Sequence, residues 1–194
     1  MKLYFIRHGQ TDWNIAGKIQ GSTDTELNST GIRQAEEMSR QVLESHIHIS
    51  RIYTSRQKRA LKTAQILSDT VKVDYEIAEG LEEMNLGAWE GLTWDEVKAK
   101  FPAEYEEWYH NRRDTRPPNA ESYQDMLNRV LAALHNIIQK NEQDVAIVTH
   151  SAVIMCLQCL ITDTPFHKMG SFKTENASFA EINSTMLVKY CNIP

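Results

Sequence analysis

Short apolar runs alternate with helical periodicities along this sequence, and the alternation restricts the choice of fold more than any other feature. Residues 3–6 and 145–149 are apolar runs of the length expected for buried strands. Residues 29–43 and 121–140 instead place apolar side chains every three to four positions, as an amphipathic helix does. This order favours an α/β fold with a mostly parallel sheet and helices on both of its faces.

The remaining segments continue the alternation. A capping box that begins at Thr93 predicts a short helix within an otherwise irregular stretch at residues 80–118. Residues 178–190 are expected to form a closing hairpin that turns at 183–185. No repeat or linker divides the chain, so we expect one domain over residues 1–194. The other expected strands and helices are, in chain order, 51–55, 56–67, 73–77 and 152–161.

The net charge and the hydropathy of the chain argue against two classes of binding partner, nucleic acid and membrane. The net charge of −5 argues against nucleic acid or a membrane surface, because both attract basic proteins. No apolar run approaches the roughly 18 residues that a membrane helix needs. The apolar run at residues 3–6 is far shorter than the core of a signal peptide, so a cytoplasmic protein is expected.

Chemically active side chains stand at the ends of the expected strands. His8 follows the first strand directly after Arg7, and His150 follows the strand at 145–149. Ligands of open parallel sheets bind beyond the carboxyl ends of the strands, so both histidines are expected to reach one small ligand. Arg59 lies in the first turn of a helix, a favourable place for phosphate. Since histidine is a competent nucleophile near neutral pH, the set predicts phosphoryl transfer but does not select a proton donor.

Ordered motifs that include these residues span nearly the whole chain. They are Arg7-His8-Gly9-Gln10-Thr11-Asp12-Trp13-Asn14, Gln20-Gly21, residues 27–35, Tyr53-Thr54-Ser55, Arg59-Ala60, Thr63-Ala64, residues 81–87, Trp89-Glu90-Gly91 and Thr149-His150. Together they resemble the phosphoglycerate-mutase-like branch of the histidine phosphatase superfamily. The resemblance implies a three-layer α/β/α sandwich of the phosphoglycerate-mutase-like type, with residues 80–118 as a lid.

The resemblance also implies a role for each matching residue. His8 would be the nucleophile that carries the phosphoryl group. Glu83, rather than its neighbour Glu82, would act as acid and base. The residues implied to hold the phosphoryl oxygens or to lie near the substrate are, in chain order, Arg7, Asn14, Gln20, Gly21, Arg59 and His150.

Some positions depart from the family pattern. Ser151 follows the second histidine, where the family usually has a glycine, although its N–H can still face phosphate. Gln10 and Thr11 stand where the cofactor-dependent mutases carry a glutamate and a serine, which favours a phosphatase. Arg112 and Arg113 argue the other way, because mutases use a similar pair to hold a second acidic group.

We therefore expect a phosphomonoesterase that hydrolyses a small phosphorylated metabolite through a phosphohistidine, without a metal or an organic cofactor. A 2,3-bisphosphoglycerate-dependent phosphoglycerate mutase is the alternative, and a catalytically silent phospholigand-binding domain is a second one. A pure binder gains nothing from a nucleophile beside an acid, which argues against the silent domain. α-Ribazole phosphate, phosphoglycerate and other small sugar or nucleotide monoesters are candidate substrates, and the oligomeric state stays open.

Overall fold

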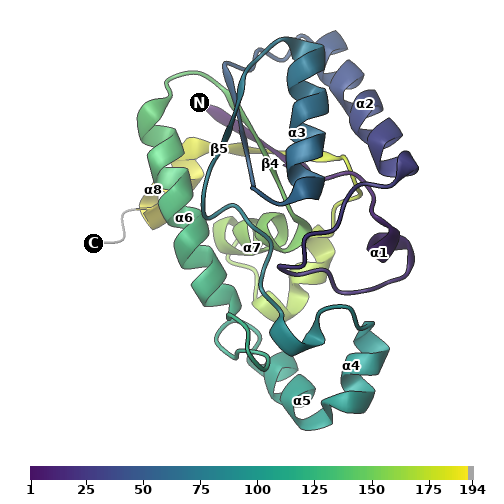
Figure 1. Ribbon diagram of the computed structural model, residues 1–194. Helices are drawn as coiled ribbons and strands as arrows, with labels where there is room; N and C mark the ends of the chain where they lie inside the picture. Colours follow the sequence, from purple (N-terminus) through teal and green to yellow (C-terminus); the bar gives the residue numbers. More distant parts are fainter. Residues whose placement is uncertain (192–194) are drawn as a thin grey trace.

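The computed structural model describes residues 1–191, and a five-stranded sheet runs through it in the order β3-β2-β4-β1-β5 (Figure 1). Four strands are parallel, and β5 pairs antiparallel with β1 at the edge. The predicted mostly parallel sheet is thereby confirmed. The strands are β1 (Lys2–Arg7), β2 (Arg51–Thr54), β3 (Tyr75–Ile77), β4 (Val145–Thr149) and β5 (Phe179–Asn183).

Helices cover both faces of the sheet, and the alternation of side chains along β1 shows why. Leu3 and Phe5 point into an apolar cluster shared with α6 and α7, whereas Tyr4 and Ile6 point into a second cluster shared with α2 and α3. Successive strand residues face opposite sides of the sheet, so one strand contributes side chains to both apolar clusters. The three-layer α/β/α sandwich is confirmed. The covering helices are α2 (Ser29–Glu44), α3 (Lys58–Val71), α6 (Tyr123–Lys140) and α7 (Ser151–Ile161).

The stretch at residues 80–118 is more helical than expected. The helix that begins after Thr93 is α4 (Trp94–Lys100), and its capping box is present as predicted. A short 3-10 turn, η1 (Gly87–Trp89), precedes α4, and a further helix, α5 (Pro102–His110), follows it. Trp108 is the one buried side chain of α5. The sequence of this helix therefore has no repeating apolar pattern from which the helix could be predicted. The ring centroid of Trp108 lies 5.3 Å from that of Trp89 and 5.2 Å from that of Trp94.

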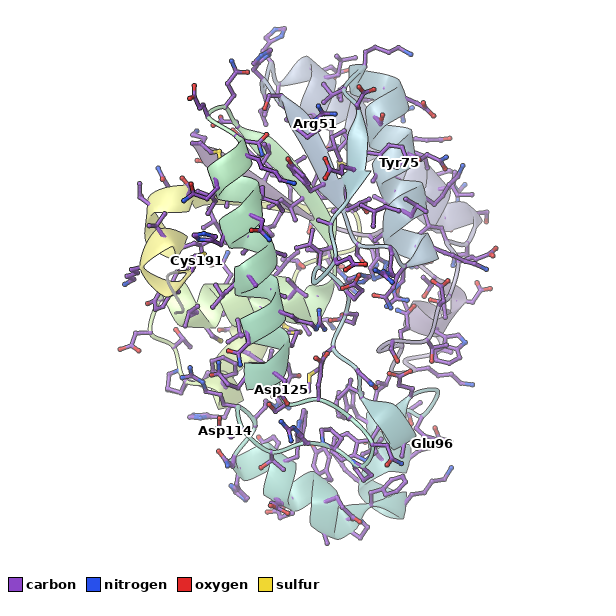
Figure 2. The ribbon with its side chains drawn as sticks, turned by 60° about the vertical axis from the view of Figure 1, so that its left-hand side comes forward. Arg51, Tyr75, Glu96, Asp114, Asp125 and Cys191 are labelled. Atoms are coloured by element: carbon purple, nitrogen blue, oxygen red, sulfur yellow. The ribbon has the colours of Figure 1, made fainter. Side chains whose placement is uncertain are left out.

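The orientation of the sheet places the strand ends near this helical stretch. Arg51 and Tyr75, which begin β2 and β3, lie at the end of the molecule away from Glu96 of α4 (Figure 2). The carboxyl ends of these parallel strands therefore point toward the part of the molecule that holds α4 and α5. The lid function of residues 80–118 stays a prediction.

The expected hairpin at residues 178–190 is wrong in its second half. Residues 179–183 form β5 as expected, but the chain then continues as helix α8 (Ser184–Cys191). Asn183 explains the change, because its side-chain oxygen accepts a hydrogen bond from the backbone N–H of Thr185 at 3.1 Å. Such a bond starts helices as well as turns, so the polar triplet was ambiguous. Ser184, Leu187 and Cys191, spaced three and four residues apart, are the buried residues of α8.

Two short elements complete the described chain, α1 (Asp12–Ile15) and the 3-10 helix η2 (Phe166–Phe172). Within residues 1–191, none of the helices combines the length and apolar character that crossing a membrane requires.

The loop after His8 lies against the first turn of α2 with no room for a side chain at Gly31. A Cβ added there would come within 2.1 Å of the Gln10 carbonyl oxygen. We expect Gly31→Ala to lower the free energy of unfolding by about 1–3 kcal/mol, the usual cost of overpacking. Helix propensity alone predicts the opposite sign, a gain of about 1 kcal/mol.

Urea unfolding measures this difference. Gly170→Ala is the matched control, because a Cβ at Gly170 would meet nothing within 4 Å. Its stability should stay within about 0.5 kcal/mol of the parent chain. A Gly31→Ala variant as stable as the parent would contradict the close approach.

Candidate active site

The two predicted histidines meet at the carboxyl end of the sheet. His8 follows β1 and His150 follows β4, and these strands are parallel neighbours in which Arg7 pairs with Thr149. The centroids of the two imidazole rings lie 5.2 Å apart, and both side chains are buried. The expectation that two adjacent strand ends bring these histidines to one place is confirmed.

The hydrogen bond of His8 fixes which of its nitrogens is nucleophilic. Nδ1 lies 2.7 Å from the carbonyl oxygen of Gly9, and a carbonyl oxygen only accepts. Nδ1 therefore carries the hydrogen, and Nε2 keeps its lone pair. Burial, and next the charge of Arg59, hold the pKa of His8 well below its ordinary value. His8 is consequently a neutral imidazole at neutral pH, with Nε2 available for attack.

Arg59 is a fully buried cation held by backbone oxygens. It stands in the first turn of α3, and its two terminal nitrogens donate to the carbonyl oxygens of Thr23 and Gly21, each at 2.8 Å. Arg7, which ends β1, donates in the same way to the carbonyl oxygen of Thr174. Burial lowers the pKa of both guanidinium groups, and the charge of Glu83 opposes that effect.

Three buried side-chain nitrogens at this site lack a hydrogen-bond partner among residues 1–191. They are Nε of Arg7, Nε of Arg59 and Nδ1 of His150. His150 has Nε2 2.9 Å from the hydroxyl oxygen of Ser55, which can donate to it and so leave the ring hydrogen on Nδ1. Burial holds the pKa of His150 well below its ordinary value, so this ring too is neutral. Unpaired buried donors are costly, and an anion would satisfy them.

Glu83 is the carboxyl group next to these donors. Its side chain is half-buried, and it accepts from the N–H of Met84 at 3.0 Å and from the N–H of Ala152, at the start of α7, at 3.4 Å. Burial raises its pKa, and the Met84 N–H and the charge of Arg59 oppose the rise. The environment therefore favours a protonated Glu83 at higher pH than an exposed glutamate would allow.

Glu82 is engaged elsewhere. Its carboxylate lies 3.3 Å from Arg56 and 3.9 Å from Arg129, and it accepts from the N–H of Gly80 at 2.8 Å. These contacts place Glu82 in an ion-pair cluster with Arg56 and Arg129. The two neighbouring glutamates thus have different partners, and the role of Glu83 as the acid stays a prediction.

The other predicted substrate-binding residues fall into two groups. The side-chain oxygen of Asn14 accepts from Asn176, which also donates to the carbonyl oxygen of His8 at 3.0 Å. Gln20 is buried, with its side-chain oxygen 2.9 Å from the Thr11 hydroxyl. The residues that lie around His8 and Arg59 are Asn14, Gln20, Gly21 and Ser151, the last as the first residue of α7.

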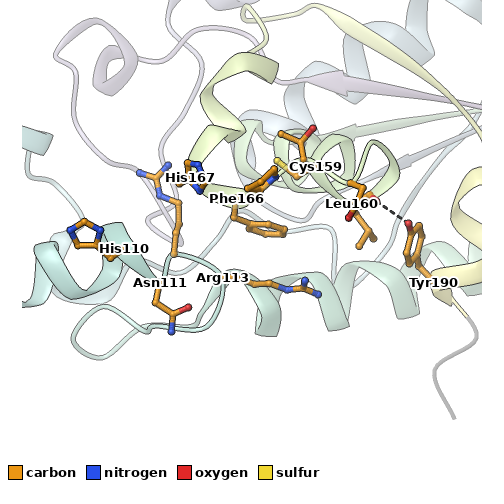
Figure 3. Close-up of a pocket in the computed structure, with 12 residues that line it drawn as sticks. His110, Asn111, Arg113, Cys159, Leu160, Phe166, His167 and Tyr190 are labelled. Carbon is orange, nitrogen blue, oxygen red and sulfur yellow. Dashed lines mark hydrogen bonds between the residues drawn. The ribbon is translucent and has the colours of Figure 1, made fainter.

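Arg112 and Arg113 lie apart from this group, beside a cavity of about 490 Å³ (Figure 3). Arg113 packs over the ring of Phe166 at 5.3 Å and donates to the side-chain oxygen of Gln124. The guanidinium of Arg112 stacks 4.2 Å from the Trp108 ring centre, and its Nε is buried without a partner among residues 1–191. The cavity contains none of the residues around His8, so it is not the phosphate site itself.

Arg112 and Glu83 both act on two buried side chains. The buried side chains of Tyr123 and Cys156 have pKa values raised mainly by burial, and both also respond to the charges of Arg112 and Glu83.

Sequence reasoning missed several residues that organise the site. Asn176 reaches the His8 carbonyl from 168 positions away, and no local pattern marks it. Glu90 stands inside one of the motifs and Gln57 beside another, but nothing in their spacing distinguishes them from solvated neighbours. Within residues 1–191, no group of three or more His, Cys, Asp or Glu side chains is arranged to hold a metal ion.

Comparison with known proteins agrees with this geometry. The family model for the histidine phosphatase superfamily (branch 1) matches residues 3–186. Putative phosphoserine phosphatase 2 of Hydrogenobacter thermophilus is 30% identical over 182 residues, covering 94% of this chain and 89% of that protein. The metal-independent phosphoserine phosphatase of Arabidopsis thaliana is 32% identical over 165 residues, covering 83% and 68% of the two chains.

A solved structure adds the fold to this comparison. A mycobacterial glucosyl-3-phosphoglycerate phosphatase in complex with VO3 superposes with a TM-score of 0.83 at 26% identity, covering 94% of this chain and 90% of that one. The predicted family, fold and small-metabolite phosphatase activity are confirmed by these matches. The chain belongs to the histidine phosphatase superfamily, branch 1.

Proposed function

We propose that this phosphatase acts on a small phosphomonoester that also carries a carboxylate, using His8 as nucleophile and no metal ion. The observation that carries the chemistry is a neutral His8 with its lone pair on Nε2, beside two arginines that each keep an unpaired buried Nε among residues 1–191. Those donors can bind the oxygens of a phosphoryl group. A loose transition state for phosphoryl transfer requires the negative charge on these oxygens to be stabilised.

The proposed reaction has two steps. In the first, Nε2 of His8 attacks phosphorus, the bond to the leaving oxygen breaks, and Glu83 gives its proton to that oxygen. In the second, water attacks the phosphohistidine, the N–P bond breaks, and the Glu83 carboxylate takes a proton from the water. Arg7, Arg59 and His150 hold the phosphoryl oxygens in both steps. Roles for Asn14, Gln20, Gly21 and Ser151 as further phosphate or substrate contacts stay predictions.

The pKa shifts suit this sequence of events. His8 is neutral above its lowered pKa, and Glu83 keeps its proton up to its raised pKa. The first step needs both forms together. The rate of phosphoenzyme formation should therefore be highest between the two pKa values and fall as pH moves outside them.

The carboxylate in the substrate is proposed from Arg112. This guanidinium is stacked on the ring of Trp108 and keeps a buried Nε without a partner among residues 1–191. The phosphoserine phosphatases among the relatives act on a compound that bears a carboxylate near its phosphate. Arg113, committed to Gln124 through its Nε, is the weaker candidate for this contact.

A second candidate is a phosphoglycerate mutase, which the pair Arg112-Arg113 favours. Gln10 and Thr11 argue for hydrolysis instead. A cytoplasmic location and the absence of nucleic-acid binding remain predictions from the sequence.

A panel of phosphomonoesters tests the proposal. We expect phosphate release in the presence of a strong chelator, fastest with carboxylate-bearing members such as phosphoserine or 3-phosphoglycerate. Isomerisation of 3-phosphoglycerate that depends on added bisphosphoglycerate would instead identify a mutase. Loss of activity on chelation, restored by a divalent cation, would contradict the metal-free site.

Arg112 makes a separate prediction about specificity. Arg112→Met should raise the KM for phosphoserine about 10- to 100-fold, because a hydrogen bond to a charged group contributes about 1.5–3 kcal/mol. The KM for phosphoethanolamine, which lacks the carboxylate, should change little. Steady-state kinetics with both substrates measures the difference.

Arg116→Met is the control, because Arg116 is exposed and pairs with Asp125. It should leave both KM values unchanged. If Arg112→Met changed the KM of both substrates equally, Arg112 would not bind the substrate carboxylate.

A further inference from the structure

The turn at residues 21–23 supplies the two carbonyl oxygens that bind Arg59, and the carboxylate of Glu90 holds that turn. Glu90 accepts from the N–H of Ser22 at 2.7 Å, from the N–H of Thr23 at 3.0 Å and from the N–H of Leu86 at 3.1 Å. A Cβ at Gly21 would lie 2.1 Å from the same carboxylate, so the turn and Glu90 are in close contact. The carbonyl oxygens that receive Arg59 therefore have a fixed position.

Gln57 connects this turn to the acid. Its side chain is buried; Nε2 donates to the carbonyl oxygen of Gly21 at 3.0 Å, and Oε1 accepts from the backbone N–H of Glu83 at 2.8 Å. A carbonyl only accepts and an N–H only donates, so both ends of the amide are assigned without ambiguity. The Gly21 oxygen is the one that also receives Arg59.

The position of Gln57 lets this bridge contact the residues that support several site side chains. Gln57 is the N-cap of α3, yet its side chain makes no capping bond and is used for the bridge instead. Its own N–H contacts the hydroxyl oxygen of Ser55 at 3.3 Å, and that hydroxyl meets His150. One residue thus touches the supports of Arg59, Glu83 and His150.

We propose that Gln57 is a positioning residue that sets Glu83 relative to the phosphoryl group held by Arg59. The inference rests on the proposed role of Glu83 as the acid for the leaving group. Gln57 contacts no reacting atom in the proposed mechanism. It fixes the backbone from which the carboxyl group reaches the leaving oxygen, and misplacement by about 1 Å is enough to slow a reaction substantially.

Leaving-group dependence separates positioning of the acid from a general structural effect. A p-nitrophenolate leaves with little help from a proton, whereas an alkoxide needs one. We expect Gln57→Met to lower kcat/KM for the best alkyl phosphate of the panel about tenfold more than kcat/KM for p-nitrophenyl phosphate. Gln57→Asn, which keeps the polarity but is too short to span both partners, should show the same bias.

Two controls complete the design. Gln65→Met makes the same chemical change at an exposed position of the same helix and should leave both rates unchanged. In a Glu83→Gln background the bias caused by Gln57→Met should disappear, because no acid remains to be positioned. Thermal unfolding of every variant reports stability independently.

The outcomes are distinguishable. A bias with both Gln57 variants that vanishes in Glu83→Gln supports the inference. Equal losses for the two substrates, or no loss, would overturn it while leaving Glu83 as the acid. If Glu83→Gln alone showed no leaving-group bias, the assignment of the acid would be wrong and the inference would fail with it.

Discussion

Arg59 is a guanidinium with no exposed surface, and the loops at the carboxyl end of the sheet are arranged to hold it. Backbone oxygens of Gly21 and Thr23 satisfy its terminal nitrogens, and Glu90 holds their turn in place. Burying a charge is costly unless it is hydrogen-bonded. These hydrogen bonds offset part of that cost and leave Nε without a partner among residues 1–191, and we propose that Nε binds a phosphoryl oxygen.

The charge of Arg59 lowers the pKa of both His8 and Glu83, but it acts with burial at His8 and against burial at Glu83. It adds to burial in lowering the pKa of His8, which keeps the nucleophile neutral. It opposes burial at Glu83, whose pKa is raised all the same. Burial is therefore the largest cause of both pKa shifts, and the direction of each shift suits the proposed role of its residue, because a nucleophile needs a free lone pair and an acid needs a proton.

The sequence predicted the fold and the meeting of the two histidines because both follow from local patterns. Buried strands that end in His8 and His150 placed the two histidines correctly, and the motif order pointed to Glu83 over Glu82. The segment after Asn183 was misjudged, since its polar triplet starts a helix as readily as it makes a turn. Gln57, Glu90 and Asn176 could not be found, because their partners lie far away in sequence and only the folded chain brings them together.

Transfer of the phosphoryl group to His8 is the central claim, and trapping it is the most direct test. The enzyme is mixed with substrate, quenched during turnover, digested and analysed by mass spectrometry. We predict acid-labile phosphate on the peptide that contains His8, no phosphate there in His8→Ala, and no turnover by that variant. Phosphate on a different residue, or near-normal turnover by His8→Ala, would contradict the proposed mechanism.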